Sequence, residues 1–189
     1  KVFSDLHKKT GRIDLLINNA GSITVGPFET MNRKDFEAQL ELHLYAVIEA
    51  TRLVLPYLRE KASEKRILNI CSMGGRVAMP HMLPYDVSKF ALSGFSQGVG
   101  AELFKEGISV TTIYPALMRT GSPIQAVFKG AHKKEFAWFQ AADVMPFLST
   151  PADVAARKIL QATYDRRWEL TPSLAAKLRM AAAVLAPDL

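Results

Sequence analysis

Cysteine is nearly absent from this chain of 189 residues, in which Cys71 is the single example. One thiol excludes an intramolecular disulfide framework and suits a reducing cytoplasm. Long apolar runs are absent too, because no stretch approaches the roughly 18 uninterrupted apolar residues of a membrane-spanning helix. The first residues, K-V-F-S-D-L-H-K-K, lack the apolar segment of a signal peptide. These absences predict a cytoplasmic protein without a transmembrane segment.

The charge balance is basic but dispersed. Lysine and arginine number 24 against 18 aspartates and glutamates, which gives a formal net charge of +6. A nucleic-acid surface would need concentrated basic residues, whereas here they are scattered among acids apart from short clusters such as Lys133-Lys134. The excess predicts solubility and some attraction for an anionic cofactor. Nucleic-acid binding is not predicted, and neither is a metal site.

Hydrophobic patterning predicts a single α/β domain over residues 1–189. Short apolar runs alternate with longer amphipathic segments, a pattern typical of a parallel sheet whose strands are joined by right-handed helical crossovers. Pro56 is expected to kink the first long helix or to end its regular part. The expected strands are 13–18, 66–71, 108–114 and 168–170, and the expected helices are 32–61, 84–106, 151–164 and 175–185, with a helix end at 1–11.

The stretch from Cys71 to Lys89 concentrates polar side chains suited to chemistry. Ser72 follows an apolar strand, at the edge where open α/β sheets place their ligand sites. Tyr85 and Lys89 lie four residues apart in a predicted helix and therefore share one face. An ammonium group beside the phenol is expected to lower the tyrosine pKa from about 10 toward neutral pH, where a general acid or base works best. The serine hydroxyl could then hold a carbonyl or carbinol oxygen while the tyrosine moves its proton.

With its neighbouring blocks, this stretch resembles the short-chain dehydrogenases/reductases. Their order and separations fit the family from about Ile13 to about Tyr164. The resemblance implies a three-layer Rossmann-type doubly wound parallel sheet, and hydride transfer between NAD or NADP and an alcohol or carbonyl carbon. The blocks are Asn18-Asn19-Ala20-Gly21, Ser72 with Gly74-Gly75, Tyr85-x-x-x-Lys89, and Pro115 with Thr120.

The resemblance implies roles for the three central side chains. Tyr85 would give or take the hydroxyl proton, and Ser72 would orient the oxygen. Lys89 would lower the tyrosine pKa and bind the nicotinamide ribose, so Tyr85 and Lys89 also belong to the cofactor site.

Further cofactor contacts are implied on either side. Pro115 would open the loop at the nicotinamide end, and Thr120 would bind the carboxamide. Asn19, Ala20 and Gly21 would line the adenosine side of the cleft and steady the central strand. An ordinary β-turn is the alternative for these last three residues, because asparagine and glycine suit turn geometry.

Two departures from the family pattern concern single residues. His43 stands where the family usually has an asparagine linked to a water relay that leads to the lysine. A histidine there could hold a water or act through its backbone carbonyl, and a pKa near 6.5 would add pH sensitivity. The alternative is a satisfied helical histidine. Ala116 replaces the glycine that commonly follows the proline, a mild change.

The third departure is larger. No glycine-rich turn of the form G-x-x-x-G-x-G precedes Ile13 or lies anywhere useful for cofactor binding. In the family, this turn brings a helix N-terminus to the pyrophosphate. We therefore expect the chain to begin in the helix before the fourth strand and to form only the C-terminal part of the doubly wound sheet. An exposed central strand would follow.

Two segments near the end of the chain remain open in interpretation. Residues 116–150 have dense aromatics, and in the family this region covers the substrate. An apolar lid implies a lipophilic part of the substrate, while packing onto the core or a partner subunit is the alternative. The C-terminal helix, within about 173–189, could dock on the body, on a partner subunit or on a membrane surface. The helices at 32–61 and 84–106 resemble the pair with which the family forms dimers and tetramers, so a homo-oligomer is expected.

Two functions follow from the sequence. The first is an NAD(P)-dependent oxidoreductase that interconverts a small-molecule alcohol and a ketone or aldehyde through Ser72, Tyr85 and Lys89. The second is a truncated, non-catalytic binding or interaction module that retains these residues without a complete cofactor pocket.

Overall fold

The computed structural model describes residues 1–60, 64–119, 122–144 and 150–186. Four parallel strands form its main sheet in the order β1-β3-β4-β8. These are β1 (Leu15–Asn18), β3 (Arg66–Ile70), β4 (Ser109–Ile113) and β8 (Glu169–Leu170). The predicted parallel α/β sheet is therefore confirmed.

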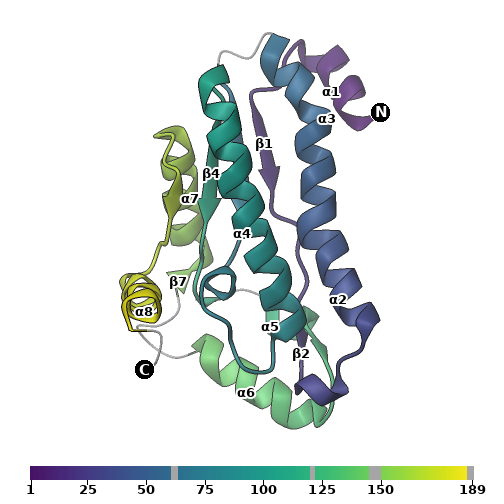
Figure 1. Ribbon diagram of the computed structural model, residues 1–189, viewed down its shortest axis with the longest axis vertical. Helices are drawn as coiled ribbons and strands as arrows, with labels where there is room; N and C mark the ends of the chain where they lie inside the picture. The colour runs from purple at the N-terminus through teal and green to yellow at the C-terminus, as the bar shows by residue number, and fades with distance from the viewer. Residues whose placement is uncertain (61–63, 120–121, 145–149, 187–189) are drawn as a thin grey trace.

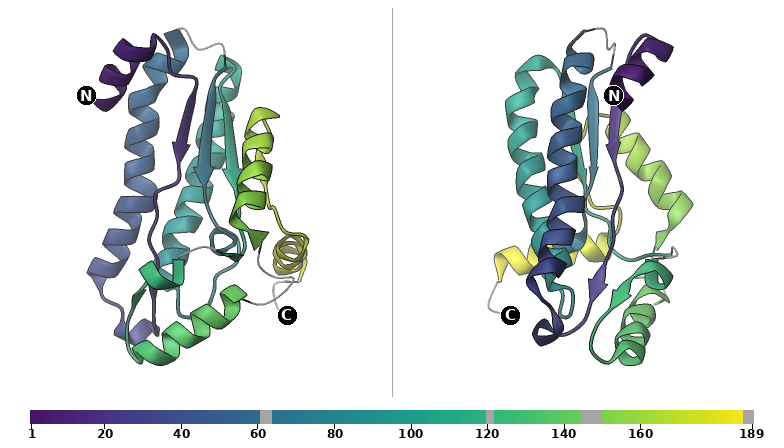
Figure 2. Two further views of the ribbon diagram at one scale, coloured as in Figure 1. Left: turned by 180° about the vertical axis from the view of Figure 1, so that it is seen from behind. Right: turned by 90° about the vertical axis from the view of Figure 1, so that its right-hand side faces the viewer.

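Helices cover both faces of this sheet. Figures 1 and 2 show α3 (Ala46–Glu60) and α4 (Leu83–Leu103) side by side on one face, with α7 (Ala152–Tyr164) on the other. This three-layer arrangement follows from strands that are apolar on both sides and must be covered twice.

The remaining elements surround the carboxyl ends of the strands or extend the three layers. Two short parallel pairs lie outside the main sheet, β2 with β6 and β5 with β7. The helices are α1 (Val2–Thr10), η1 (Phe28–Thr30), α2 (Arg33–Leu40), η2 (Glu41–Tyr45), η3 (Met73–Gly75), η4 (Phe104–Glu106), α5 (Ser122–Gln125), α6 (His132–Val144) and α8 (Leu174–Leu185). The short strands are β2 (Thr24–Val25), β5 (Met118–Arg119), β6 (Val127–Phe128) and β7 (Thr150–Pro151).

Successive side chains of β3 point to opposite faces of the sheet, so the core has one part under each helical layer. Ile67 packs with Val54 and Leu58 of α3. Its neighbour Leu68 points the other way and packs with Ile159 of α7. Successive strand side chains face opposite sides, so a fully buried strand needs apolar residues at adjacent positions.

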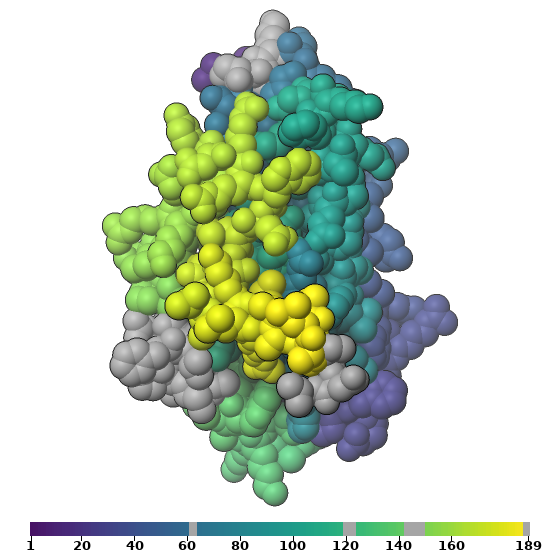
Figure 3. Space-filling view, turned by 60° about the vertical axis from the view of Figure 1, so that its left-hand side comes forward, coloured from purple at the N-terminus to yellow at the C-terminus, as the bar shows by residue number. Residues whose placement is uncertain are grey.

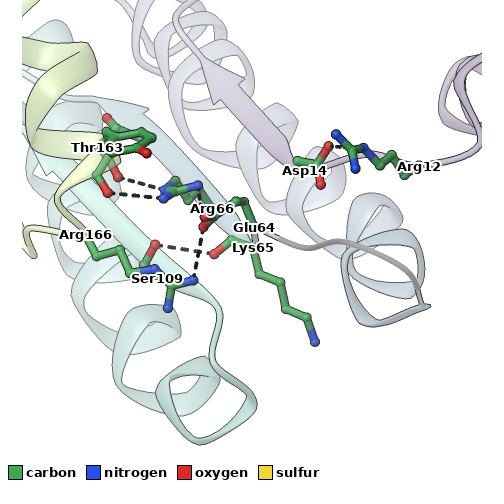
Figure 4. A network of polar contacts seen from close by, with 9 residues as sticks. Arg12, Asp14, Glu64, Lys65, Arg66, Ser109, Thr163 and Arg166 are labelled. Carbon is green, nitrogen blue, oxygen red and sulfur yellow. Dashed lines mark hydrogen bonds and ion pairs between the residues drawn. The ribbon is translucent and has the colours of Figure 1, made fainter.

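A buried arginine joins the start of β3 to the end of α7 (Figure 4). The Arg66 guanidinium donates to the carbonyl oxygens of Thr163 at 3.1 Å and Tyr164 at 3.2 Å, and it pairs with Glu64 at 2.7 Å. The last carbonyls of a helix are unsatisfied within the helix and carry partial negative charge, which a cation stabilises. Arg66 thus fixes α7 against the sheet.

The helix predicted at 32–61 is interrupted at a different place from the one expected. Asn32 caps α2 in a capping box with Asp35. The chain then forms the π-helix η2, and α3 continues through Pro56 to Glu60. Of the two expectations for Pro56, a kink or an end of the regular helix, the second was wrong, because α3 continues past Pro56 and buries Leu58 in the core.

Residues 116–150 contain more regular structure than their sequence pattern suggested. The described part includes α6, thirteen residues long, which the aromatic density had obscured because apolar side chains occur on several of its sides. Met145 and Phe147 lie outside the described residues.

Two apolar surfaces are left uncovered by the described residues. Strand β1 forms one edge of the sheet, and its Leu15 and Ile17 side chains are 37% and 47% exposed. Helix α8 lies on the outside of the molecule (Figure 3), where Ala176 is buried and Leu178 is exposed. Of the possible positions for α8, the structure shows docking on the body. Within the described residues, no helix is long and apolar enough to cross a membrane.

Substitution by alanine should change the free energy of unfolding in opposite directions at two glycines. An alanine Cβ at Gly75 would lie 2.6 Å from Cys71 Sγ and 2.7 Å from the Lys89 carbonyl oxygen, whereas one at Gly94 would meet nothing within 4 Å. We expect Gly75→Ala to lower the free energy of unfolding by about 1–3 kcal/mol through overpacking. Gly94→Ala should raise it by about 0.5–1 kcal/mol because it restricts the unfolded chain. Urea denaturation measures both, and equal values for the two variants would contradict this packing.

Candidate active site

A pocket of about 480 Å³ opens where the parallel strands of the main sheet end. Ser72 follows β3, Asn19 and Gly21 follow β1, and Pro115 follows β4. The carboxyl ends of parallel strands meet at one edge, so residues distant in sequence converge there. Tyr85, from the first turn of α4, completes this polar half of the pocket.

Ser72 is positioned by the turn that it begins. Its Oγ accepts a hydrogen bond from the Gly74 amide at 3.1 Å, which caps η3. The next amide, that of Met73, donates to the Pro115 carbonyl oxygen at 2.8 Å. The serine hydroxyl is therefore held at the pocket wall by backbone from two strand ends.

Tyr85 and Lys89 lie on the face of α4 that looks into the pocket. The Lys89 ammonium donates to the Ile70 carbonyl oxygen at 3.0 Å, and its Nζ lies 5.6 Å from the centre of the Tyr85 ring. The helical spacing places both side chains as predicted. With Ser72, they form one wall of the pocket.

Lys89 was expected to lower the pKa of Tyr85, and the structure does not show this. Burial raises the pKa of Tyr85 above its ordinary value, and an interaction with the Ser72 side chain only partly opposes this shift. Burial also lowers the pKa of Lys89 to about 8. The ammonium stands over the ring and serves a backbone carbonyl, so desolvation of the phenolate outweighs its attraction. Tyr85 is a neutral phenol at neutral pH in this environment.

His43 is a satisfied, buried histidine that links three segments. Its Nε2 accepts from the Ser22 amide at 3.2 Å, and its Nδ1 lies 2.8 Å from Ser88 Oγ. The Ser88 hydroxyl donates to the Tyr85 carbonyl oxygen at 2.7 Å, so Ser88 can only accept from His43, whose proton is therefore on Nδ1. Burial, reinforced by the nearby Lys89 charge, lowers the pKa of His43 to about 3. The proposed pH sensitivity near pH 6.5 was wrong, because the imidazole stays neutral there.

Of the residues at the end of β1 and after it, one bonds to the neighbouring strand and others line the pocket. The Asn18 amide donates to Asn69 of β3 at 2.8 Å, and Asn69 donates to Ser96 of α4 at 2.9 Å. Asn19 and Gly21 line the pocket, whereas Ala20 is exposed beside it. The strand is thus steadied by Asn18, while the cofactor contact expected of Asn19, Ala20 and Gly21 stays a prediction, with Ala20 outside the pocket lining.

The residues after β4 are only partly described. Pro115 and Ala116 line the pocket. Thr120, the predicted carboxamide ligand, lies outside the described residues.

Asp86 was not predicted from the sequence, although it follows Tyr85 directly. One carboxylate oxygen accepts from the Met79 amide at 2.7 Å. The other is buried and has no hydrogen-bond partner among the described residues. Burial raises the pKa of Asp86 to about 7. The sequence shows an acidic residue next to Tyr85, which could have drawn attention to Asp86. Its burial could not be predicted, because it arises only when the turn after β3 folds onto α4.

The second half of the pocket is apolar. One wall comes from the loop before α4, with Met79 and Met82, and the facing wall from α6, with Trp138 and Phe139. Ile23, Leu117, Met118 and Ala126 extend it. Across the described parts of the chain, no group of three or more histidine, cysteine, aspartate or glutamate residues could hold a metal ion.

His43 and Asp86 should give opposite pH dependences of stability. The folded-state pKa of His43 lies below its ordinary value of 6.5, so the unfolded chain binds the extra proton and stability falls as pH drops from 6.5 toward 3. The folded-state pKa of Asp86 lies above its ordinary value of 3.8, so stability falls as pH rises from 3.8 toward 7. In the parent protein the two dependences offset each other.

Asp86→Asn should leave the His43 dependence exposed. The free energy of unfolding should then rise with pH between about 4 and 6.5 more steeply than in the parent, as measured by urea denaturation at fixed pH values. His43→Gln should change the slope in the opposite direction. A slope in Asp86→Asn equal to that of the parent would show that the buried carboxyl is ionised throughout.

Comparison with known sequences gives a family for this chain. The family model described as "short chain dehydrogenase" matches residues 1–127. The chain is 38% identical over 122 residues to Oxidoreductase BOA17 of Botryotinia fuckeliana, a match that covers 63% of this chain and 44% of that protein. It is 36% identical over 111 residues to the 3-ketodihydrosphingosine reductase of Bacteroides thetaiotaomicron, covering 59% of this chain and 41% of that protein. The matched segment thus spans less than half of either relative.

Solved structures support the same assignment. A short-chain dehydrogenase from Streptomyces avermitilis superposes with a TM-score of 0.85 at 26% identity, over 98% of this chain and 70% of that chain. A short chain dehydrogenase/reductase from Burkholderia phymatum, solved in complex with NAD, gives a TM-score of 0.84 at 19% identity over the same shares, which shows the fold alone. Because the family match covers more than half of its residues, the chain belongs to the short-chain dehydrogenase family.

Proposed function

We propose that this chain carries the catalytic half of an NAD(P)-dependent oxidoreductase that interconverts an alcohol and a ketone or aldehyde. The observation that carries the proposal is the meeting of Ser72, Tyr85 and Lys89 on one wall of a pocket whose other half is apolar. The polar wall has the groups needed to hold and protonate an oxygen, and the apolar half can take the rest of the substrate.

The pocket fits the nicotinamide end of the cofactor. Among the described residues that line it, none is an aspartate or glutamate, and Lys89 supplies a buried positive charge. Such a lining places no negatively charged side chain against an anionic cofactor. Lys89 and Tyr85 would hold the ribose, Pro115 the nicotinamide side, and Asn19 and Gly21 the opposite rim. Solved family members bound to NAD and to NADP support a nicotinamide cofactor without selecting one.

The sequence has no evident site for the pyrophosphate of the cofactor. The single G-x-x-x-G-x-G spacing in this sequence runs from Gly94 to Gly100, in the middle of α4 rather than in a turn after a strand. Amides inside a helix are already bonded to carbonyl oxygens four residues earlier, so this segment has none free to offer a phosphate. The residues present thus account for the nicotinamide half of the cofactor.

The chemistry of the chain follows from the protonation states of its side chains. When bound, the cofactor supplies or accepts the hydride. Tyr85, held as a neutral phenol by burial, gives its proton to a carbonyl oxygen during reduction. Ser72 Oγ donates to the same oxygen and keeps it within reach of the phenol. The Lys89 ammonium stabilises the phenolate left behind, because its Nζ remains near the ring.

The substrate is proposed to be a neutral molecule with a lipophilic portion. Met82, Trp138 and Phe139 line the far half of the pocket and offer no charge to a carboxylate or an ammonium group. The name of the Bacteroides relative, a 3-ketodihydrosphingosine reductase, agrees only with the reduction of a ketone.

Self-association is also proposed. Apolar side chains remain exposed on the outer helical layer, among them Leu53 of α3 and Phe90 of α4. A homodimer or tetramer that covers these helices would remove such side chains from water.

A binding module is the second candidate function. Strand β1 is an exposed edge, and the sequence offers no pyrophosphate turn after a strand. A chain of this kind would retain the pocket and turn over no substrate. Turnover of any ketone by the purified protein separates the two candidates.

Tyr85→Phe should reduce ketone turnover by about 10²–10⁴-fold, because the variant removes the proton donor and keeps the ring. Cofactor affinity should stay nearly unchanged, because Lys89 remains to contact the ribose. The assay follows NADPH and NADH oxidation with a panel of cyclohexanone, acetophenone and benzophenone. Tyr45→Phe, at a half-exposed tyrosine of η2, is the matched control and should retain parental activity. Equal activity in Tyr85→Phe and the parent would refute the assigned mechanism.

Titration with NADH and NADPH tests the cofactor site directly. Saturable binding, seen as enhanced nicotinamide fluorescence and an increase in Tm, is expected to weaken in Lys89→Met because the variant loses the ribose contact. Arg157→Met, at an exposed residue of α7, is the charge-matched control. Parental affinity in Lys89→Met would place the cofactor elsewhere.

A further inference from the structure

A polar contact between His81 and Glu135 joins the two walls of the apolar half of the pocket. The His81 Nδ1–H donates to Glu135 Oε2 at 2.7 Å, with the histidine side chain 42% exposed and the glutamate side chain 8% exposed. His81 lies in the chain between Met79 and Met82 of one wall. Glu135 lies one helical turn before Trp138 and Phe139 of the other. The contact therefore ties the loop before α4 to α6.

His81 is held in place by more than its side chain. Its φ is 65°, a left-handed conformation that few side chains other than asparagine, aspartate and histidine adopt readily. Its carbonyl oxygen accepts from the Gly26 amide at 2.8 Å. The imidazole also lies 5.7 Å from the Trp138 ring. The backbone thus presents the imidazole to α6 from a fixed point.

Helix α6 also has an apolar anchor. Phe128 of β6 meets Phe136 and Phe139 edge to face, with ring centres 5.5 Å and 6.2 Å apart. Phe139 also shares a buried cluster with Met82. Apolar contacts are non-directional and leave the helix free to shift, whereas a hydrogen bond to a charged group fixes a distance.

We propose that the His81–Glu135 contact is a latch that determines substrate specificity. It fixes α6 against the loop before α4 and so sets the width of the apolar slot between Met82 and Trp138. The slot takes the lipophilic part of a neutral ketone or alcohol, and the latch limits how bulky that part can be. This inference rests on the proposed function for its substrate class.

Burial of the glutamate makes the latch sensitive to its partner. His81 is the side-chain partner of the Glu135 carboxylate among the described residues. Without the imidazole, an ionised carboxylate would be left in a largely dry site, at a cost far above that of a neutral group. The helix would then move outward to hydrate Glu135. An amide at position 135 carries no such cost.

The test uses His81→Asn, which retains the preference for a left-handed backbone and loses the reach of the imidazole. Hydrogen exchange of the α6 amides should become about tenfold faster, because a hydrogen bond to a charged group is lost. His81→Asn/Glu135→Gln should return exchange to within about threefold of the parent, since the buried charge is gone as well. His132→Asn, at an exposed histidine of the same helix, should exchange like the parent.

Specificity is measured as affinity for benzophenone relative to cyclohexanone, by ligand-observed NMR with saturating NADPH and without it. His81→Asn should shift this ratio about tenfold toward benzophenone. Parental exchange rates in His81→Asn, or an unchanged affinity ratio despite faster exchange, would each overturn the latch. Neither readout requires turnover. Faster exchange with a shifted ratio in a protein that oxidises no NADPH would support the latch and reject only the oxidoreductase activity.

Discussion

The close approach of the turn after β3 to the helix α4 is the constraint on which the site depends. Gly75 lies so near the Lys89 carbonyl that no side chain fits between them, and Cys71 Sγ donates to the same carbonyl oxygen at 3.2 Å. Asp86 fastens the far side of the turn through the Met79 amide. Because the turn carries the serine and the helix carries the phenol and ammonium, their separation is fixed by backbone packing.

Burial rather than ion pairing governs the protonation states in the pocket. The phenol of Tyr85 and the imidazole of His43 are both kept neutral by desolvation, and the pKa of Lys89 is lowered to about 8 by the same cause. Among the described residues that line the pocket, Lys89 is the one lysine or arginine, and its charge is partly compensated by the Ile70 carbonyl oxygen. A neutral phenol is the form that donates a proton to a carbonyl oxygen. His43, through Ser88, holds the backbone of that tyrosine, and it does not take up a second proton near neutral pH.

The pocket has two halves with different origins in the chain. The polar half is built where the strands of the main sheet end, and the superposition with solved short-chain dehydrogenases covers it. The apolar half comes from the loop before α4 and from α6, where Phe128 and Phe139 anchor the helix. The polar half carries the groups proposed to act on the substrate. The apolar half is proposed to limit which molecules can reach them.

The sequence by itself determined the alternation of strands and helices and the spacing of Tyr85 and Lys89, because both depend on local periodicity. It could not determine that α3 runs through Pro56, that Asp86 is buried, or that His43 is neutral and bonded to Ser22 and Ser88. The sequence likewise gave no sign that His81 meets Glu135 across 54 positions of the chain. These features arise from burial and from partners far apart in sequence, and desolvation and long-range contacts exist only once the tertiary structure has formed.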